Sequence, residues 1–312
     1  MWWIFSAGVL LVVALMSTAV FWVLIRRRKT GEQRQLQPGA PGSYEEKKYR
    51  QAEAERWLAN QPTLERVEIR SEDGLRLAGH LLPAEGGGKK ILLASHGYRC
   101  SGLREWGLYA DFWHRQGYQL MMPDHRAHGD SEGRYIGFGW LDRRDLLRWC
   151  DYLCGRFGED CEILLHGISM GSAAVLLTGS EKTLPKQVKG IIADCGFTNA
   201  WEEACYRFRA DYHLPPFPFF YGADLLCRLR AGYSLRQADV LGRVGDIRVP
   251  VLFLHGDADS YVPTEMGYRL YAACRAPKKL VILRDTIHAN AFLGDGAGYR
   301  RAVLEFTRQI GR

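Results

Sequence analysis

The sequence predicts an α/β fold in which helices cover both faces of a mostly parallel sheet. From about residue 64 onward, short apolar segments alternate with longer segments of helical period. Buried parallel strands have such continuous apolar stretches, because neither face of their sheet meets water. The 312 residues are 47% hydrophobic and 25% charged. This is enough apolar material for one large core or two small ones.

Residues 2–25 contain no charged side chain and are rich in Val, Leu, Phe and Trp. As a helix they would be about 36 Å long, enough to cross a hydrocarbon core of about 30 Å. The basic residues 26–29 (RRRK) follow at once, and the positive-inside rule then places the C-terminal side in the cytoplasm. We expect residues 1–29 to be a single-pass anchor. The alternative is a cleaved signal peptide with a small-residue site at residues 17–19, although no basic segment precedes the apolar stretch.

Residues 30–62 are expected to be a linker followed by a charged helix. The Gly, Pro and Gln content of residues 30–42 is typical of a flexible tether. Residues 43–59 begin with S-x-x-E, the capping-box pattern that starts a helix. Most charges of this helix should face solvent, and we expect Tyr49 and Trp57 to dock it on the domain or on the membrane surface.

Residues 63–312 are expected to form the α/β domain itself. The predicted strands are residues 67–71, 75–82, 90–95, 118–123, 162–165, 188–193, 250–254 and 279–283. The predicted helices are residues 103–116, 141–156, the segment after Ser169, 264–274 and 299–310. Sheets of this kind bind their ligands at the carboxyl ends of the strands. The loops that follow the strands are therefore the places to look for chemistry.

Residues 163–174 (ILLHGISMGSAA) join a short apolar strand, a G-x-S-x-G motif and an apolar segment suited to a helix. In that context the motif forms a sharp turn that presents Ser169 above the edge of the sheet. Gly167 and Gly171 leave room where the strand and helix backbones crowd each other. The N–H groups at the helix N-terminus suit a developing oxyanion. The motif alone arises by chance in many chains, so the serine must be judged by its partners.

A nucleophilic serine needs a base, and the base needs a group that orients it. His288 follows the last predicted strand, and both Asp257 and Asp259 follow the strand before it. Pro263 is well placed to begin the next helix, which puts Asp259 in the middle of its loop, where a side chain can turn toward a neighbouring loop. Asp257 lies nearer the strand end and is expected to bind the N–H groups of its own turn.

Two backbone N–H groups are candidates for an oxyanion hole. The amide of Met170 directly follows the nucleophile, and that of Tyr98 lies in a Gly-containing loop after the strand 90–95. The histidines of three strand ends, His96, His166 and His255, are expected to hydrogen-bond loops rather than to react.

Residues 197–240 interrupt the alternation of strands and helices, and we expect them to form a cap over the site. They contain an aromatic cluster of Phe217, Phe219, Phe220 and Tyr221. These rings either line a groove for an acyl chain or pack the cap onto the domain, and the sequence leaves both interpretations open.

The composition argues against several classes of partner. The net charge of +7 is partly local to residues 26–29, and no basic patch is interleaved with aromatic residues as nucleic-acid binding would require. The eight cysteines are scattered without a C-x-x-C pair, which is typical of reduced, buried thiols rather than of disulfides or a zinc site. We expect neither a metal nor a cofactor.

Several motifs together resemble the α/β-hydrolase superfamily. They are residues 96–98 (HGY), 124–133 (DHRAHGDSEG), 167–171 (GISMG), 194–195 (DC), 255–263 (HGDADSYVP) and His288. From about residue 64 to its end, the chain is similar to the serine aminopeptidase/lysophospholipase-like branch, which includes membrane-anchored bacterial members. The resemblance implies the α/β-hydrolase fold with a helical cap, and it implies Ser169 as nucleophile, Asp259 as acid and His288 as base. The order Ser…Asp…His is that of this superfamily.

We therefore expect a serine hydrolase of class EC 3.1, either a carboxylesterase or a lysophospholipase-like enzyme. It would cleave a carboxylic ester or thioester of a small molecule or lipid, at the cell membrane, with its catalytic domain in the cytoplasm. Amidase, peptidase or acyltransferase activity on the same residues is the first alternative, and a non-catalytic binding protein is the second. The complete set of Ser169, Asp259 and His288 argues against the second. The oligomeric state is left open.

Overall fold

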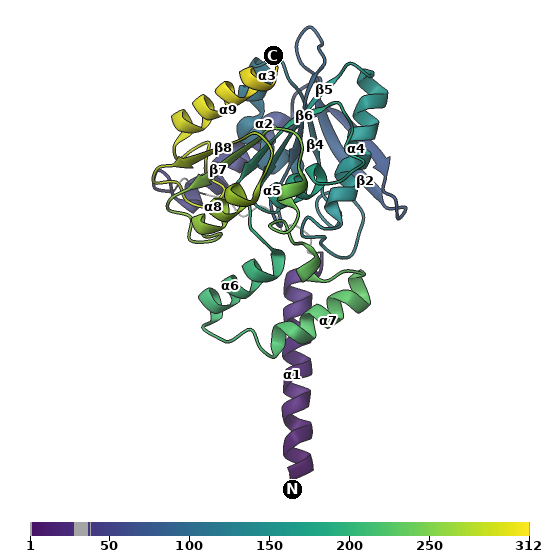
Figure 1. Cartoon of the computed structure of the whole chain (residues 1–312), viewed down its shortest axis with the longest axis vertical. Helices are drawn as coiled ribbons and strands as arrows, with labels where there is room; N and C mark the ends of the chain where they lie inside the picture. The colour runs from purple at the N-terminus through teal and green to yellow at the C-terminus, as the bar shows by residue number, and fades with distance from the viewer. Residues whose placement is uncertain (1, 28–36, 38, 312) are drawn as a thin grey trace.

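The structure is a computed structural model that describes residues 2–27, 37 and 39–311. Its centre is an eight-stranded sheet with the strand order β1-β2-β4-β3-β5-β6-β7-β8 (Figure 1). β2 pairs antiparallel with both β1 and β4, and all other neighbours are parallel. The strands are β1 (Glu65–Arg70), β2 (Arg76–Leu82), β3 (Lys90–Ser95), β4 (Gln119–Pro123), β5 (Glu162–Ile168), β6 (Val188–Asp194), β7 (Val251–Gly256) and β8 (Lys278–Leu283).

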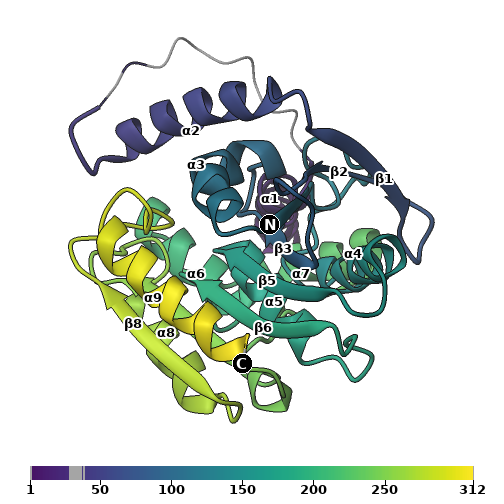
Figure 2. The same ribbon diagram turned by 90° about the horizontal axis from the view of Figure 1, so that it is seen from above.

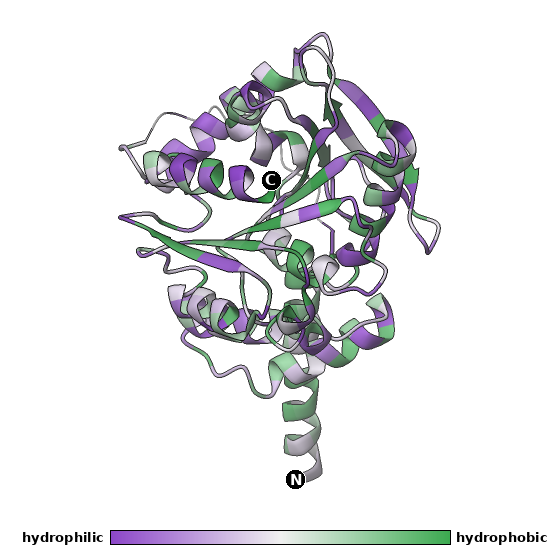
Figure 3. Ribbon diagram, turned by 45° about the horizontal axis from the view of Figure 1, so that its top comes forward, coloured by the Kyte–Doolittle hydropathy of each residue, from purple (hydrophilic) through white to green (hydrophobic). Residues whose placement is uncertain are grey.

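Helices cover both faces of this sheet, so the central strands are buried on both sides, as their apolar sequences predict (Figures 2 and 3). One face packs against α3 (Gly102–Arg115) and α9 (Gly296–Ile310). The other packs against α4 (Asp142–Phe157), α5 (Met170–Gly179) and α8 (Thr264–Ala273). The predicted α/β fold is confirmed, and each predicted strand and helix of residues 64–312 is present, with ends within a few residues of those expected.

Helix α2 (Tyr44–Ala59) begins at the predicted capping residue: the Ser43 hydroxyl accepts a hydrogen bond from the Glu46 amide at 3.1 Å. It packs on α3, where a Cβ on Gly107 would come within 2.9 Å of the backbone of Ala54. The expectation that Tyr49 and Trp57 dock this helix on the domain is wrong, whereas their contact with a membrane surface stays a prediction. The residues that α2 buries are Lys47, Gln51, Ala52 and Leu58. The close approach of α2 to α3 at Gly107 determines which face of α2 is buried, and the two aromatic rings do not lie on that face.

Helix α1 (Trp2–Ile25) coincides with the predicted apolar segment. By length and composition, Phe5–Ile25 could cross a membrane, and a signal sequence would satisfy the same criteria. The helix projects from the domain with its N-terminus at the far end (Figure 1). After it, Arg26 pairs with Tyr135. The other end of the basic segment, residues 28–29, lies outside the described residues, as does most of the expected tether 30–42.

The expected cap contains α6 (Ala200–Tyr212), α7 (Phe219–Ala231) and a 3₁₀ turn, Leu235–Gln237. An isolated bridge between Asn199 and Asp239 joins the two ends of this insertion. α6 and α7 lie on either side of α1, between the sheet and the projecting end of that helix (Figure 1). The cap and α1 thus form one helical layer at the carboxyl ends of the strands.

Candidate active site

Ser169 stands in a strained turn between β5 and α5. Its φ of 57° and ψ of −116° lie in a region that non-glycine residues rarely occupy. The two neighbouring glycines permit this turn, as the sequence predicts. A Cβ on Gly167 would lie 2.1 Å from the Gly171 carbonyl oxygen, and a Cβ on Gly171 would lie 2.1 Å from that of Ser95. No side chain fits at either position, so the motif fixes the backbone that presents the Ser169 hydroxyl.

His288 and Asp259, which follow β8 and β7, complete a hydrogen-bonded chain with Ser169. His288 Nε2 lies 2.8 Å from Ser169 Oγ, and His288 Nδ1 lies 2.7 Å from Asp259 Oδ2. The ring of Tyr261 stacks on the imidazole at a centroid distance of 4.9 Å. The His288 side chain is 19% exposed whereas the Asp259 side chain is fully buried. This arrangement can remove a proton from Ser169 and stabilise the resulting imidazolium.

The other oxygen of Asp259 holds the loop that carries it. Asp259 Oδ1 accepts hydrogen bonds from the amides of Tyr261 and Val262, both at 2.9 Å. Burial alone would raise the pKa of this carboxyl, but the contacts with His255 and His288 hold the pKa well below its ordinary range. Asp259 is therefore ionised at neutral pH.

Of the two acid candidates, the structure brings only Asp259 to His288, and Asp257 is exposed. The expectation that Asp257 binds the N–H groups of the turn is wrong, because Asp259 accepts them itself. His255 Nε2 lies 3.0 Å from the Val262 carbonyl oxygen and 3.4 Å from Asp259 Oδ2. The prediction that His255 supports a loop is confirmed, and its contact with the acid is one that the sequence did not reveal.

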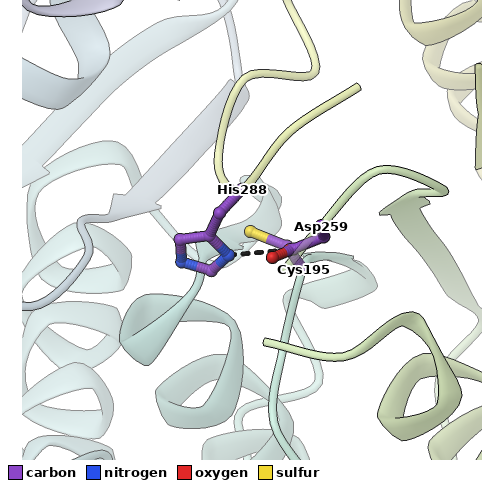
Figure 4. Close-up of side chains that lie close together, drawn as sticks. All are labelled: Cys195, Asp259 and His288. Carbon is purple, nitrogen blue, oxygen red and sulfur yellow. Dashed lines mark hydrogen bonds and ion pairs between the residues drawn. The ribbon is translucent and has the colours of Figure 1, made fainter. Parts of the chain in front are cut away.

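Cys195 of the D-C motif lies beside these hydrogen-bonded residues, a position that the sequence analysis did not predict. Its Sγ and the ligating atoms of Asp259 and His288 all lie within 4.8 Å of one another (Figure 4). Burial, together with the carboxylates of Asp194 and Asp259, raises the pKa of the Cys195 thiol well above its ordinary value. It is a neutral thiol at pH 7, and the two other members of the cluster already hydrogen-bond each other. The cluster therefore belongs to the Ser169 site.

The two expected oxyanion donors lie beside Ser169. Met170 is the first residue of α5, where helix geometry leaves the N–H without an intrahelical acceptor. Tyr98 lies in the β3–α3 loop, and a Cβ on the preceding Gly97 would be 3.5 Å from the Ser169 Cβ. His128 Nε2 accepts a hydrogen bond from the Arg99 amide at 3.1 Å. His128 thus braces the loop beside the site.

An apolar cavity of about 400 Å³ leads to Ser169 between the sheet and the cap. Of the two interpretations of the four cap aromatics, the acyl groove holds only for Phe220, which lines the cavity. The groove interpretation is wrong for Phe217 and Tyr221, which are exposed, and for Phe219, which instead packs on the core outside the cavity. Adjacent residues on α7 point about 100° apart, so consecutive rings cannot share one wall.

The lining that the sequence analysis missed comes from other elements. It includes Met16, Ala19, Val20, Val23 and Leu24 of α1, Glu203, Ala204, Arg207, Phe208, Asp211 and Tyr212 of α6, and Phe138, Phe197 and Tyr261 of loops. The sequence of α1 does not reveal this packing, because a uniformly apolar helix has no polar face to show which side is packed.

A second, more polar cavity of about 690 Å³ meets the first at Ser169, Tyr98, Arg99 and Tyr261. The helix α2 forms part of its wall with Lys47 and three neighbours. Burial alone would lower the pKa of Lys47, but the Glu105 carboxylate, 3.7 Å from its Nζ, raises the pKa above its ordinary value. Ser169 thus lies at the junction of an apolar space and a polar one.

A second serine–histidine–aspartate set lies below the β3–α3 loop. Ser95 Oγ is 2.8 Å from His125 Nε2, and His125 Nδ1 is 3.3 Å from Asp142 Oδ1. All three residues are buried, and none lines either cavity. The set connects β3 to α4 and has no access to a substrate.

Parts of this chain are similar to known proteins. Residues 87–210 match the family "Serine aminopeptidase, S33". The chain is 35% identical over 190 residues to YqkD of Bacillus subtilis, covering 61% of this chain and 62% of YqkD. It is 29% identical over 194 residues to the α/β-hydrolase domain-containing protein WAV2 of Arabidopsis thaliana, covering 60% of this chain and 59% of WAV2. The matches thus span about three fifths of the length of these two relatives.

The esterase Pf2001 of Pyrococcus furiosus has a similar structure, with a TM-score of 0.66 and 23% identity, over 81% of this chain and 93% of that one. Its similarity demonstrates the fold. The sheet order, the strained serine turn and this structural similarity together show that the chain has the α/β-hydrolase fold.

Proposed function

We propose that this chain is a membrane-anchored serine hydrolase that cleaves a carboxylic ester or thioester through an acyl-enzyme on Ser169. The family match and the similarity to an esterase support hydrolase activity. The observation that carries the choice of residues is the unbroken path from Ser169 Oγ through both ring nitrogens of His288 to Asp259. The path begins where an apolar and a polar cavity meet, which suits an acyl group on one side and a leaving group on the other.

In the first half-reaction, His288 Nε2 takes the proton of Ser169 as Oγ attacks the carbonyl carbon. Asp259 keeps the other ring proton on Nδ1 and stabilises the imidazolium. The amides of Met170 and Tyr98 receive the negative charge that develops on the carbonyl oxygen. When the tetrahedral intermediate collapses, the imidazolium gives its proton to the leaving alcohol or thiol, and the acyl group remains on Ser169.

In the second half-reaction, His288 takes a proton from water, and the hydroxide oxygen attacks the acyl carbon. Collapse of this intermediate returns the proton to Ser169 and releases the carboxylic acid. The enzyme is thereby restored.

A fluorophosphonate probe tests this proposal, because it labels only an activated serine. Wild-type protein should be labelled, and Ser169→Ala should lose both labelling and about 10⁴-fold or more of its esterase activity. Ser172→Ala is the matched control: this buried serine lies one turn along α5, and its loss should leave labelling intact. Persistent labelling of a folded Ser169→Ala protein would contradict the proposal.

A further inference from the structure

The last turns of α1 are part of the hydrolase domain. Phe21 and Ile25 are 2% and 1% exposed, and the Phe21 ring lies 5.6 Å from that of Tyr135. A Cβ on Gly222 of α7 would come within 2.2 Å of Ser17 Oγ. This side of α1 thus packs against α7 closely enough to require a glycine.

A second side of the same helix lines the apolar cavity that leads to Ser169. Its residues are Met16, Ala19, Val20, Val23 and Leu24. Their spacing of three and four places them on one face of an α-helix. All five side chains are apolar, so this wall offers dispersion contacts and burial but no hydrogen bonds. It therefore fits an alkyl chain better than a polar group.

The C-terminal end of α1 is bonded to the loop that carries an expected oxyanion donor. The Tyr98 hydroxyl donates to the Leu24 carbonyl oxygen at 2.9 Å, and the Arg99 guanidinium donates to that of Val23. Terminal carbonyls of a helix lack intrahelical donors and carry partial negative charge, which suits these two groups. The wall of α1 is thus held in a fixed position relative to Ser169.

The first half of α1 is exposed and apolar, in contrast to the second. Eight of its large side chains are between 48% and 89% exposed, namely Trp2, Trp3, Phe5, Val9, Leu10, Leu11, Val12 and Leu15. A continuous apolar surface of this kind marks a contact with a membrane or with another protein. Its length, composition and position at the end of a projecting helix fit a lipid bilayer (Figures 1 and 3).

We propose that α1 is both the element embedded in the bilayer and one wall of the acyl-binding site, so that the acyl chain of a bilayer lipid reaches Ser169 along this helix. The inference rests on the proposed hydrolase function and names its substrate class: long-chain acyl esters that reside in the membrane. The cavity face of α1 then determines which chain lengths are accepted.

The test compares two neighbouring positions on α1, using full-length protein in phosphatidylcholine vesicles. Ala19→Phe adds a ring to the cavity wall, whereas Thr18→Phe adds the same ring about 100° around the helix, outside the lining. The readout is the ratio of kcat/KM for the dodecanoyl and acetyl esters of p-nitrophenol. Ala19→Phe should lower this ratio about tenfold or more, because the added ring would displace at least two methylenes of the dodecanoyl group from the cavity. Thr18→Phe should leave it unchanged.

Val23→Ala provides a second variant, because it widens the cavity and should move the optimum toward longer chains. The proposal is overturned if folded Ala19→Phe and Val23→Ala proteins keep the wild-type ratio. It is also overturned if Thr18→Phe lowers the ratio as much as Ala19→Phe does. In both of these outcomes the variants would still hydrolyse the acetyl ester, so the proposed hydrolase function would stand. Failure of the wild type to hydrolyse any ester, with no labelling of Ser169, would instead refute the hydrolase function itself.

Discussion

At the scale of single residues, Asp259 has two tasks that the sequence analysis assigned to two residues. One carboxylate oxygen binds His288 and the other binds the amides of Tyr261 and Val262. The position of Asp259 in its loop made its contact with His288 predictable. Its second task was not predictable, because an Asx turn depends on backbone angles that any of several aspartates in a loop can satisfy. Asp257 was equally plausible for that role.

We expect Asp259→Asn to reduce kcat by about 10⁴, because an amide facing Nδ1 favours the wrong tautomer of His288. The asparagine oxygen can still accept from the amides of Tyr261 and Val262, so the melting temperature should change little. Asp257→Asn is the control, since Asp257 is exposed and makes no contact with His288 among the described residues. The measurement compares the two variants, Asp259→Asn and Asp257→Asn, by kcat on one activated ester and by melting curve. A larger loss of kcat in a folded Asp257→Asn protein would reverse the assignment.

At the scale of elements, the strands and the serine turn were predictable, whereas the lining of the cavity was not. Short apolar segments that alternate with helical ones indicate buried strands, and Gly167 and Gly171 specify the turn. The cap aromatics gave no such signal. Until the register of α7 is known, nothing separates Phe220, which faces the cavity, from Tyr221, which faces solvent. The role of α1 was hidden for a related reason, since all of its faces are apolar.

Helix α6 places an acid, Glu203, in the wall of the apolar cavity. Neither of its carboxylate oxygens has a hydrogen-bond partner among the described residues. Burial raises the pKa of Glu203 to about 8, although Arg207 opposes this shift. The carboxyl is therefore neutral at pH 7 and becomes charged as the pH rises through about 8. A charge there should disfavour an alkyl chain in the cavity.

The ratio of kcat/KM for dodecanoyl and acetyl esters should accordingly fall as the pH rises above about 8, and Glu203→Gln should abolish this fall. Because the ratio cancels any effect of pH that is common to both esters, it isolates the cavity. The free energy of unfolding should also depend on the Glu203 carboxyl. The folded protein retains a proton on this group that the unfolded chain releases near pH 4.5. Glu203 therefore contributes less to the free energy of unfolding as the pH rises from about 4.5 to about 8. If the wild-type ratio of kcat/KM for the two esters did not change with pH, Glu203 would not titrate beside the bound alkyl group.

At the scale of the whole molecule, the packed half of α1 shortens the part that can lie in lipid. Residues 2–15 extend about 21 Å as a helix, which is about 9 Å less than a typical hydrocarbon core. Interfacial helices sink about 5–10 Å into a bilayer. The cap offers exposed apolar side chains beside α1, among them Leu225 and Leu229 of α7. Immersion of the cap would therefore make up the missing length and bring the cavity to the level of the lipid.

The double variant Leu225→Glu/Leu229→Glu tests this immersion. Its activity on a dodecanoyl ester in phosphatidylcholine vesicles should fall roughly tenfold, since two apolar contacts with lipid are lost. Its activity on soluble acetyl ester should not change. Tyr268→Glu, an exposed aromatic of α8 on the body of the domain, is the control and should leave both activities intact. Equal losses on the two esters would argue against an immersed cap.

The basic segment after α1 is only partly available to lipid headgroups. Arg27 donates through its guanidinium to the carbonyl oxygens of Ser131 and Gly129, at 2.5 and 2.6 Å. It thereby fastens the end of the helix to the loop after β4. The sequence rule that counts flanking charges to predict orientation cannot distinguish such an internal arginine from one that faces phosphates.

The bonds between α1 and the β3–α3 loop bear on how this protein is prepared. Removing an N-terminal apolar helix is a common route to soluble protein, and here it would delete one wall of the cavity that leads to Ser169. The shortened protein would lack the acceptors of Tyr98 and Arg99 and would open the cavity to bulk water. Turnover of short, soluble esters by such a protein would describe a different specificity from that of the full chain, and an inhibitor selected against it would be fitted to a surface that the intact protein covers.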